Sequence, residues 1–178
     1  MRMPAVLAAS AVLVIAGCSD STETSESDGS AKSGKSTPGS KFIKRMDGIC
    51  EDRYVASIPY INRLNTLDER LSAAEPSSAE SRALVIAEAK VTRAQLRVSL
   101  PSVEALRALT PPPSDKRFLT DYIRALEQSY RALEKTARAL ESFNPVSLKA
   151  AGKERDAANA RVQELATRRG GLFNCETP

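Results

Sequence analysis

The residues of this chain with the most specific chemistry are its three cysteines, Cys18, Cys50 and Cys175. A thiol can carry a lipid, bind a metal ion or pair with a second thiol in a disulfide. An odd number of cysteines leaves one over if all of them are available for pairing. The sequence around each cysteine must therefore indicate its use.

No other group of residues indicates catalysis. The chain has no histidine, which excludes Ser-His-Asp and Cys-His nucleophiles and histidine-based metal sites. Asp47 and Glu51 have the i,i+4 spacing of paired carboxylates on one helix face. Because acids near a helix start are favoured by the helix dipole, we interpret this pair as surface charge. We predict no catalytic residue, no metal site and no cofactor, and hence no enzyme.

One stretch, residues 29–36, matches the Gly-x-x-x-x-Gly-Lys-Ser spacing of a phosphate-binding loop. That loop works between a buried strand and a helix. Here an acidic polar tract precedes the stretch and Thr37-Pro38-Gly39 follows it. We interpret it as a chance match in a tract rich in Gly, Ser and Lys.

The start of the chain has the pattern of an export signal. Arg2 is followed by an apolar run from Ala5 to Ala16 that only Ser10 interrupts. The run is too short for a helix that crosses a bilayer, which needs about 20 apolar residues.

This run ends in Ile15-Ala16-Gly17-Cys18, which resembles the lipobox of bacterial lipoproteins. The resemblance covers residues 1–18 only. It implies that residues 1–17 are a removable signal peptide and that Cys18 carries diacylglycerol. It also implies that the protein is anchored to the outer, extracytoplasmic face of a bacterial plasma membrane. The alternative is an ordinary secretory signal, which leaves Cys18 as a free thiol.

After the lipidation site, residues 18–40 hold neither an aromatic nor a large aliphatic side chain. Such a segment cannot bury enough apolar surface to offset its ordering entropy, so we predict a disordered tether with a reach of about 25 Å. Residues 41–178 are the predicted domain. They carry 23 basic and 18 acidic side chains, so the predicted folded part is the basic part.

Apolar residues spaced three and four apart predict four helices, at about 41–72, at about 77–109, after Ser114 and at about 145–168. Pro59 and Pro101 predict kinks in the first two helices. Helix caps are expected at Ser114 and Asn144, and at Ser77 with Glu80 or else at Glu75 before Pro76.

The third helix contains a sevenfold repeat of Arg-Ala-Leu-Glu, at residues 124–127, 131–134 and 138–141. The repeat predicts an apolar seam through Leu126, Leu133 and Leu140, with Glu127–Arg131 and Glu134–Arg138 pairs on the outside. An intermolecular coiled coil is one interpretation. With fewer than four heptads and three other amphipathic helices available, we favour a seam inside one chain.

Four helices with short connectors predict an all-α, up-down-up-down four-helix bundle. In that topology the start of the first helix and the end of the fourth lie at the same end, which brings Cys50 and Cys175 together. With Cys18 lipidated, these two cysteines remain as a pair in an oxidising compartment, and we predict a disulfide between them. Two unpaired buried cysteines are the alternative.

The same end gathers basic side chains that an anionic membrane surface would attract: Lys41, Lys44, Arg45, Arg107, Lys116, Arg117, Arg168 and Arg169. Helix dipoles account for those at helix C-termini, Arg107, Arg168 and Arg169, but not for those at N-termini. We predict that this end faces the membrane. Ordinary surface scatter is the alternative.

The modest net charge of +4, the absence of Trp and the four Tyr and four Phe residues argue against a nucleic-acid partner. We expect a non-catalytic binding or scaffolding module of the cell envelope, with a membrane attachment and an envelope protein as partner. The alternative is a carrier or sensor of a small apolar ligand, held in a bundle opened by the proline kinks. The pattern does not indicate an oligomeric state.

Overall fold

The computed structural model of the protein describes residues 38–175. The predicted signal peptide, Cys18, the tether up to residue 37 and the stretch 29–36 lie outside the described residues. Every described residue belongs to one compact unit of the chain, Lys35–Pro178.

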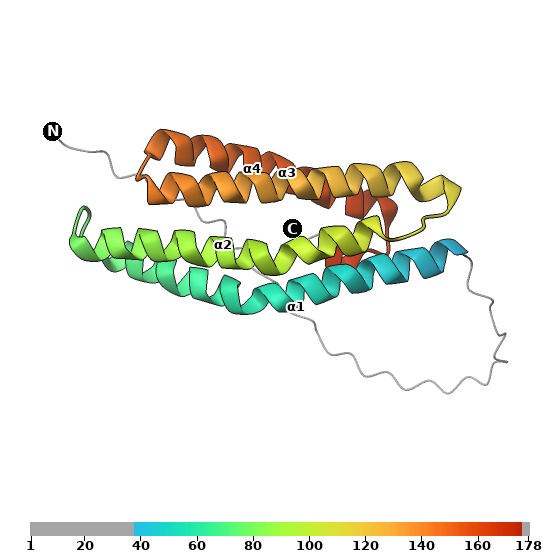
Figure 1. Cartoon of the computed structure of the whole chain (residues 1–178), viewed down its shortest axis with the longest axis horizontal. Coiled ribbons are helices and arrows are strands. Elements are labelled where there is room, and N and C mark those ends of the chain that lie inside the picture. Colours follow the sequence, from blue (N-terminus) through green and yellow to red (C-terminus); the bar gives the residue numbers. More distant parts are fainter. Residues whose placement is uncertain (1–37, 176–178) are drawn as a thin grey trace, which may run out of the picture. The chain divides into compact units, whose positions relative to one another are not determined.

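Four helices make up this unit: α1 (Pro38–Ala73), α2 (Ala79–Arg107), α3 (Lys116–Glu141) and α4 (Pro145–Arg169). Two short 3-10 turns, η1 (Pro113–Asp115) and η2 (Phe173–Cys175), lie before α3 and after α4. Helices that follow one another in the chain pack side by side, α1 on α2, α2 on α3 and α3 on α4 (Figure 1). The predicted four-helix bundle is confirmed. The turn η2 packs on both α1 and α4 and links the first helix to the last.

The two prolines do not break the helices. Both α1 and α2 continue through Pro59 and Pro101, and α1 bends near its middle (Figure 1). Ser57 and Ser99, each two residues before a proline, are buried, and their hydroxyl oxygens lie 3.2 Å apart. The two proline sites therefore lie side by side where α1 meets α2.

The predicted helix caps are right for α4 and wrong for α2 and α3. The side chain of Asn144 accepts a hydrogen bond from the backbone N–H of Ser147, as expected for an N-cap. In α2 the cap is Ser78, whose hydroxyl accepts from the N–H of Ser81. A backbone hydrogen bond from Ser78 N–H to the Glu75 carbonyl closes a turn there and moves the helix start past Ser77.

In α3 the predicted cap Ser114 is exposed and lies within η1. The residue before α3 is Asp115, and its carboxylate makes no cap hydrogen bond. That carboxylate is instead paired with an arginine of α4, an interaction between distant segments that a local cap pattern does not show.

The predicted seam of α3 faces the inside of the bundle. Leu126, Tyr130 and Leu140 are buried, while Leu133 is half-buried against the main core. On the outside the two predicted ion pairs are present, with N–O distances of 3.7 Å for Arg131–Glu127 and 3.1 Å for Arg138–Glu134.

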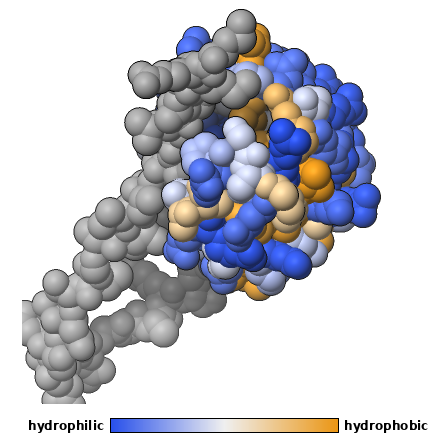
Figure 2. Space-filling view, turned by 90° about the vertical axis from the view of Figure 1, so that its left-hand side faces the viewer, coloured by the Kyte–Doolittle hydropathy of each residue, from blue (hydrophilic) through white to orange (hydrophobic). Residues whose placement is uncertain are grey.

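The core is unevenly filled along the bundle. The largest fully buried side chains, which include Tyr122, Met46 and Leu106, belong to one cluster around the disulfide. The half of the bundle that ends in the two helix–helix turns has two smaller clusters, one around Leu67 between α1 and α2 and one around Ala137 between α2 and α3. Figure 2, a view onto that end, shows a hydrophilic surface with hydrophobic residues gathered toward its middle.

Candidate functional site

The predicted basic residues of α1 and α3 lie together at the end of the bundle where α1 and α3 begin and α2 and α4 end (Figure 1). We call this the basic end. Lys41, Lys44, Arg45 and Lys116 are exposed there. Within residues 38–175 none of these four side chains makes an ion pair. Their charge is therefore available to an external partner.

The other predicted cations of this end have acidic neighbours. Arg117 is 94% exposed and lies 3.8 Å from Asp121. Arg168 lies 2.6 Å from the Glu164 carboxylate. A hydrogen bond from Arg161 holds the pKa of Glu164 below its ordinary value, and the charges of Arg161 and Arg168 act in the same direction. These pairs reduce the net charge that Arg117 and Arg168 present.

Two further arginines of the end are engaged with other helices. Arg169 donates to both carboxylate oxygens of the buried Asp115, at 2.8 and 3.2 Å. This pair joins the end of α4 to the start of α3. Arg107 pairs with Glu104 of its own helix and with Glu127 of α3. Both arginines connect helices. Among the described residues, the unpaired cations of the basic end are therefore Lys41, Lys44, Arg45 and Lys116, and Arg117 and Arg168 are paired at the surface.

The predicted disulfide is confirmed: Cys50 and Cys175 are bonded, with Cα atoms 5.0 Å apart. Both cysteines are fully buried. The hydroxyl of Tyr122 donates to the backbone carbonyl of Cys175 at 2.9 Å. Burial is the main cause that raises the pKa of Tyr122 to about 12. The bond and its surroundings fasten η2 to α1, which is a structural role.

The carboxylate pair considered for chemistry is divided by the fold. Asp47 accepts hydrogen bonds from the backbone N–H and the side-chain amide of Asn174, at 2.8 and 3.0 Å. Glu51 is exposed. In the part of the chain that the structure describes, no group of three His, Cys, Asp or Glu side chains is placed to hold a metal ion. Asp47 holds the C-terminal segment in place.

A groove that the sequence did not indicate lies between α2 and α3. Its volume is about 1100 Å³. Its two ends are bridged by ion pairs from α2 to α3, Arg93 with Glu134 and Glu141 at one end and Arg107 with Glu127 at the other. The two arginines lie 14 positions apart on α2, a length of about 20 Å along a helix.

The middle of this groove is apolar. Leu96, Val103 and Tyr130 are buried in its floor, whereas Leu100 is 51% exposed beside the exposed Pro101. The hydroxyl of Tyr130 is buried and has no hydrogen-bond partner within the described residues. One sequence signal could have indicated it: Leu100 lies at the edge of the buried stripe of α2, next to a proline. The register of α2 against α3, which brings Tyr130 to the same place, is a tertiary property.

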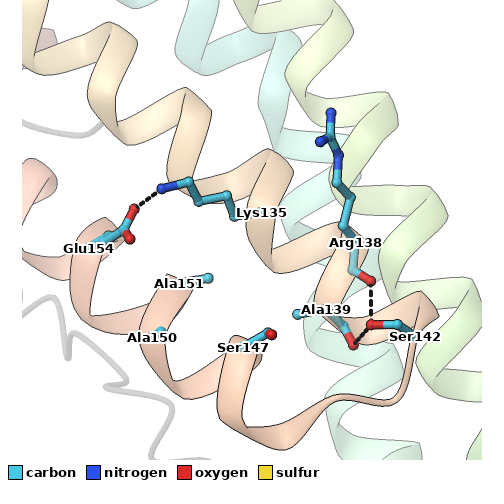
Figure 3. Close-up of a pocket in the computed structure, with 8 residues that line it drawn as sticks. All are labelled: Lys135, Arg138, Ala139, Ser142, Ser147, Ala150, Ala151 and Glu154. Atoms are coloured by element: carbon cyan, nitrogen blue, oxygen red, sulfur yellow. Dashed lines mark hydrogen bonds and ion pairs between the residues drawn. The ribbon is translucent and has the colours of Figure 1, made fainter.

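A second, smaller hollow of about 330 Å³ lies between α3 and α4. Figure 3 shows small side chains on its walls, among them Ala139, Ala151 and Ser147, with the Lys135–Glu154 ion pair across one side. Ser142 donates to the carbonyls of its own helix. The hollow follows from the alanines that face each other on the two helices.

No protein family, characterised protein or solved structure matches this chain. Among the described helices, none is both long and apolar enough to cross a membrane. The candidate surfaces are therefore the basic end and the α2–α3 groove. The evidence for both is the exposure, charge and arrangement of their own side chains.

Proposed function

We propose that the protein is a non-catalytic, lipid-anchored module of the bacterial cell envelope, attached through Cys18 and oriented with its basic end toward an anionic membrane surface. The observation that carries this proposal is the free charge of Lys41, Lys44, Arg45 and Lys116. These cations lie at the end where α1 begins, which is the end that the chain enters from the anchor side.

The magnitudes favour orientation as the role of this charge. Each cation near an anionic bilayer contributes about 1 kcal/mol, and the effect fades beyond a Debye length of about 10 Å. Four such charges bind weakly by themselves, whereas the two acyl chains of a diacylglycerol suffice for a stable anchor. The anchor would keep the protein at the membrane, and the basic end would set which face of the bundle looks outward.

In that orientation the end with the two helix–helix turns faces away from the membrane. Phe143 and Val146, at the turn from α3 to α4, are 48% and 78% exposed. Exposed apolar side chains at an outward end favour contact with another envelope protein. This supports a binding or scaffolding role.

The alternative is a carrier of an apolar ligand in a cavity opened by the proline kinks. Between α1 and α2 the kinks are closed, because Ser57 and Ser99 are buried and in hydrogen-bond contact. The hollow beside Pro101 lies instead between α2 and α3. It supports a ligand site of a different kind, which is argued below.

The anchor is tested by growing expressing cells with a labelled fatty acid. The protein should take up the label, and Cys18→Ser should abolish it and release the protein from membranes. Cys50→Ala is the matched control, because it also removes one thiol but should keep the label. Equal labelling of Cys18→Ser and the unmodified sequence would refute lipidation.

The orientation is tested by binding of residues 35–178 to vesicles that contain anionic phospholipid. Weak binding that fades as the salt concentration rises is expected. Changing Lys41, Lys44, Arg45 and Lys116 to glutamate should abolish it. Glutamate is favoured at helix N-termini, so these changes are compatible with the fold.

A matched control carries the same change of charge at the other end of the bundle, through glutamate at Arg63, Arg82, Lys149 and Lys153. These side chains are exposed and make no ion pair within the described residues. The control should still bind the vesicles. If both variants lose binding equally, net charge alone drives adsorption and the proposed orientation is wrong.

A further inference from the structure

The α2–α3 groove has ion pairs at both ends and apolar side chains between them. At both ends, arginines of α2 are neutralised by glutamates of α3. The stretch between these bridges has apolar side chains as its floor, and Leu100 keeps half of its surface in water. An apolar strip with closed ends is a shape that fits a narrow, elongated apolar group.

One charge in this groove is not balanced. Arg93 and Arg107 are held by the end bridges, and Arg131 lies 3.7 Å from Glu127. Arg97 is exposed and makes no ion pair among residues 38–175. It lies one helical turn from Leu100 on the same side of α2. The groove therefore offers a free cation at the edge of an apolar strip.

Size and charge together select the occupant. The bridging arginines lie about 20 Å apart along α2, and Arg97 lies about 15 Å from Arg107, a length that holds most of an extended alkyl chain of about 16 carbons. An apolar chain placed on Leu100 and Pro101 removes exposed apolar surface from water. An acidic head group placed at Arg97 gains a charge-assisted hydrogen bond.

We propose that the groove between α2 and α3 binds a single-chain anionic amphiphile, with its alkyl chain along Leu96, Leu100 and Pro101 and its acidic group on Arg97. Both a long-chain fatty acid and a lysophospholipid with an anionic head group have this chemistry. The membrane to which the protein is proposed to be anchored would be the source of either. The site itself is independent of how the bundle is oriented.

The test uses the full-length chain in phosphatidylcholine vesicles that contain a trace of palmitic acid carrying a photoactivatable diazirine. After irradiation and trypsin digestion, label is expected on residues 98–107 of α2 and 125–131 of α3. Trypsin releases both as separate peptides, because each is bounded by arginines. Peptides from the outer faces of α1 and α4 should stay unlabelled.

Two variants and their matched controls locate the site. Arg97→Gln should lower labelling by about tenfold, as expected for loss of one charge-assisted hydrogen bond. Because this change removes a trypsin site, the α2 label of this variant is measured on residues 94–107. Arg82→Gln removes an exposed, unpaired cation elsewhere on α2 and should have no effect. Leu100→Asp should abolish labelling, whereas Ile86→Asp, at a side chain that is 38% exposed on the same helix, should not.

Competition then separates the head groups. Unlabelled palmitate or lysophosphatidylglycerol should displace the probe, and the one that does so at lower concentration identifies the source. Hexadecanol, which has the same chain without the charge, should compete at least tenfold more weakly.

The proposal is overturned if hexadecanol competes as well as palmitate, or if Arg97→Gln and Arg82→Gln behave alike. It is also overturned if residues 98–107 stay unlabelled. Vesicle binding by the basic end is measured separately, so failure of one proposal is distinguishable from failure of the other.

Discussion

The disulfide gives the largest expected effect on stability. It connects Cys50 in α1 with Cys175 in η2, across 125 residues of chain. The perturbation is the double variant Cys50→Ala with Cys175→Ala, which removes the bond and leaves no unpaired thiol in the core. Reducing agent applied to the unmodified protein gives the same loss of the bond without a mutation.

The magnitude follows from the length of the closed loop. A bond that closes 125 residues lowers the entropy of the unfolded chain enough to stabilise the native state by about 5 kcal/mol in the chain-entropy description. Domains of this size are stable by about 5 to 15 kcal/mol in total. Loss of the bond should therefore remove a large part of the stability of the bundle.

The native contacts around η2 should largely survive this loss. Asp47 still binds Asn174, and the Tyr122 hydroxyl still donates to the carbonyl of residue 175. We therefore expect a native-like helical circular dichroism spectrum without denaturant and an earlier unfolding transition with it. At a urea dependence of about 2 kcal/mol per molar, the midpoint should fall by about 2.5 M.

The assay is urea unfolding of the oxidised, reduced and double-alanine proteins, followed by circular dichroism. The reduced protein and the variant should unfold at similar urea concentrations. A difference of less than about 1 kcal/mol between oxidised and reduced protein, at equal urea dependence, would refute the loop argument. Two reactive thiols in the denatured, unreduced domain would refute the disulfide itself.

Two smaller effects are expected elsewhere. The pKa of Tyr122 is raised from 10.0 to about 12, so the unfolded chain loses this proton at lower pH than the folded protein does. The free energy of unfolding should therefore be unaffected by Tyr122 below pH 10 and should fall by about 3 kcal/mol as the pH rises toward 12. Tyr122→Phe should remove this dependence in urea titrations at several pH values. Asn144→Ala should lower stability by about 1 kcal/mol through loss of the α4 cap, whereas Ser114→Ala should change it little because Ser114 caps no helix. Equal losses for the two alanine variants would contradict the assignment of the caps.

Local patterns along the chain were enough to predict much of this fold. The spacing of apolar residues placed α2 and α4 nearly at their ends, and Asn144 before Pro145 marked the start of α4 correctly. The disulfide followed from topology, because alternating helices return Cys175 to the level of Cys50. These features depend on the helical period and on chain connectivity, and both can be predicted from the local sequence pattern.

Other features depend on which distant segments meet. The carboxylate of Asp115 forms an ion pair with Arg169 and makes no cap hydrogen bond to α3, and Ser114 makes none either. Ser57 and Ser99 come together only because the two prolines lie at the same level of α1 and α2. A propensity reports on a residue and its near neighbours, and such pairings are decided by the side-chain packing of whole helices.

The sequence by itself determined the export pattern, the four helices, their antiparallel order and the gathering of basic residues at one end. The tertiary structure decided which of those residues are free: it paired Arg169 with Asp115 and left Lys41, Lys44, Arg45 and Lys116 exposed. It also created the α2–α3 groove by setting Arg93 and Arg107 opposite glutamates of α3 and Leu100 between them. The physical reason is the register of one helix against the next, which is set by packing and ion pairs between residues 20 to 48 positions apart.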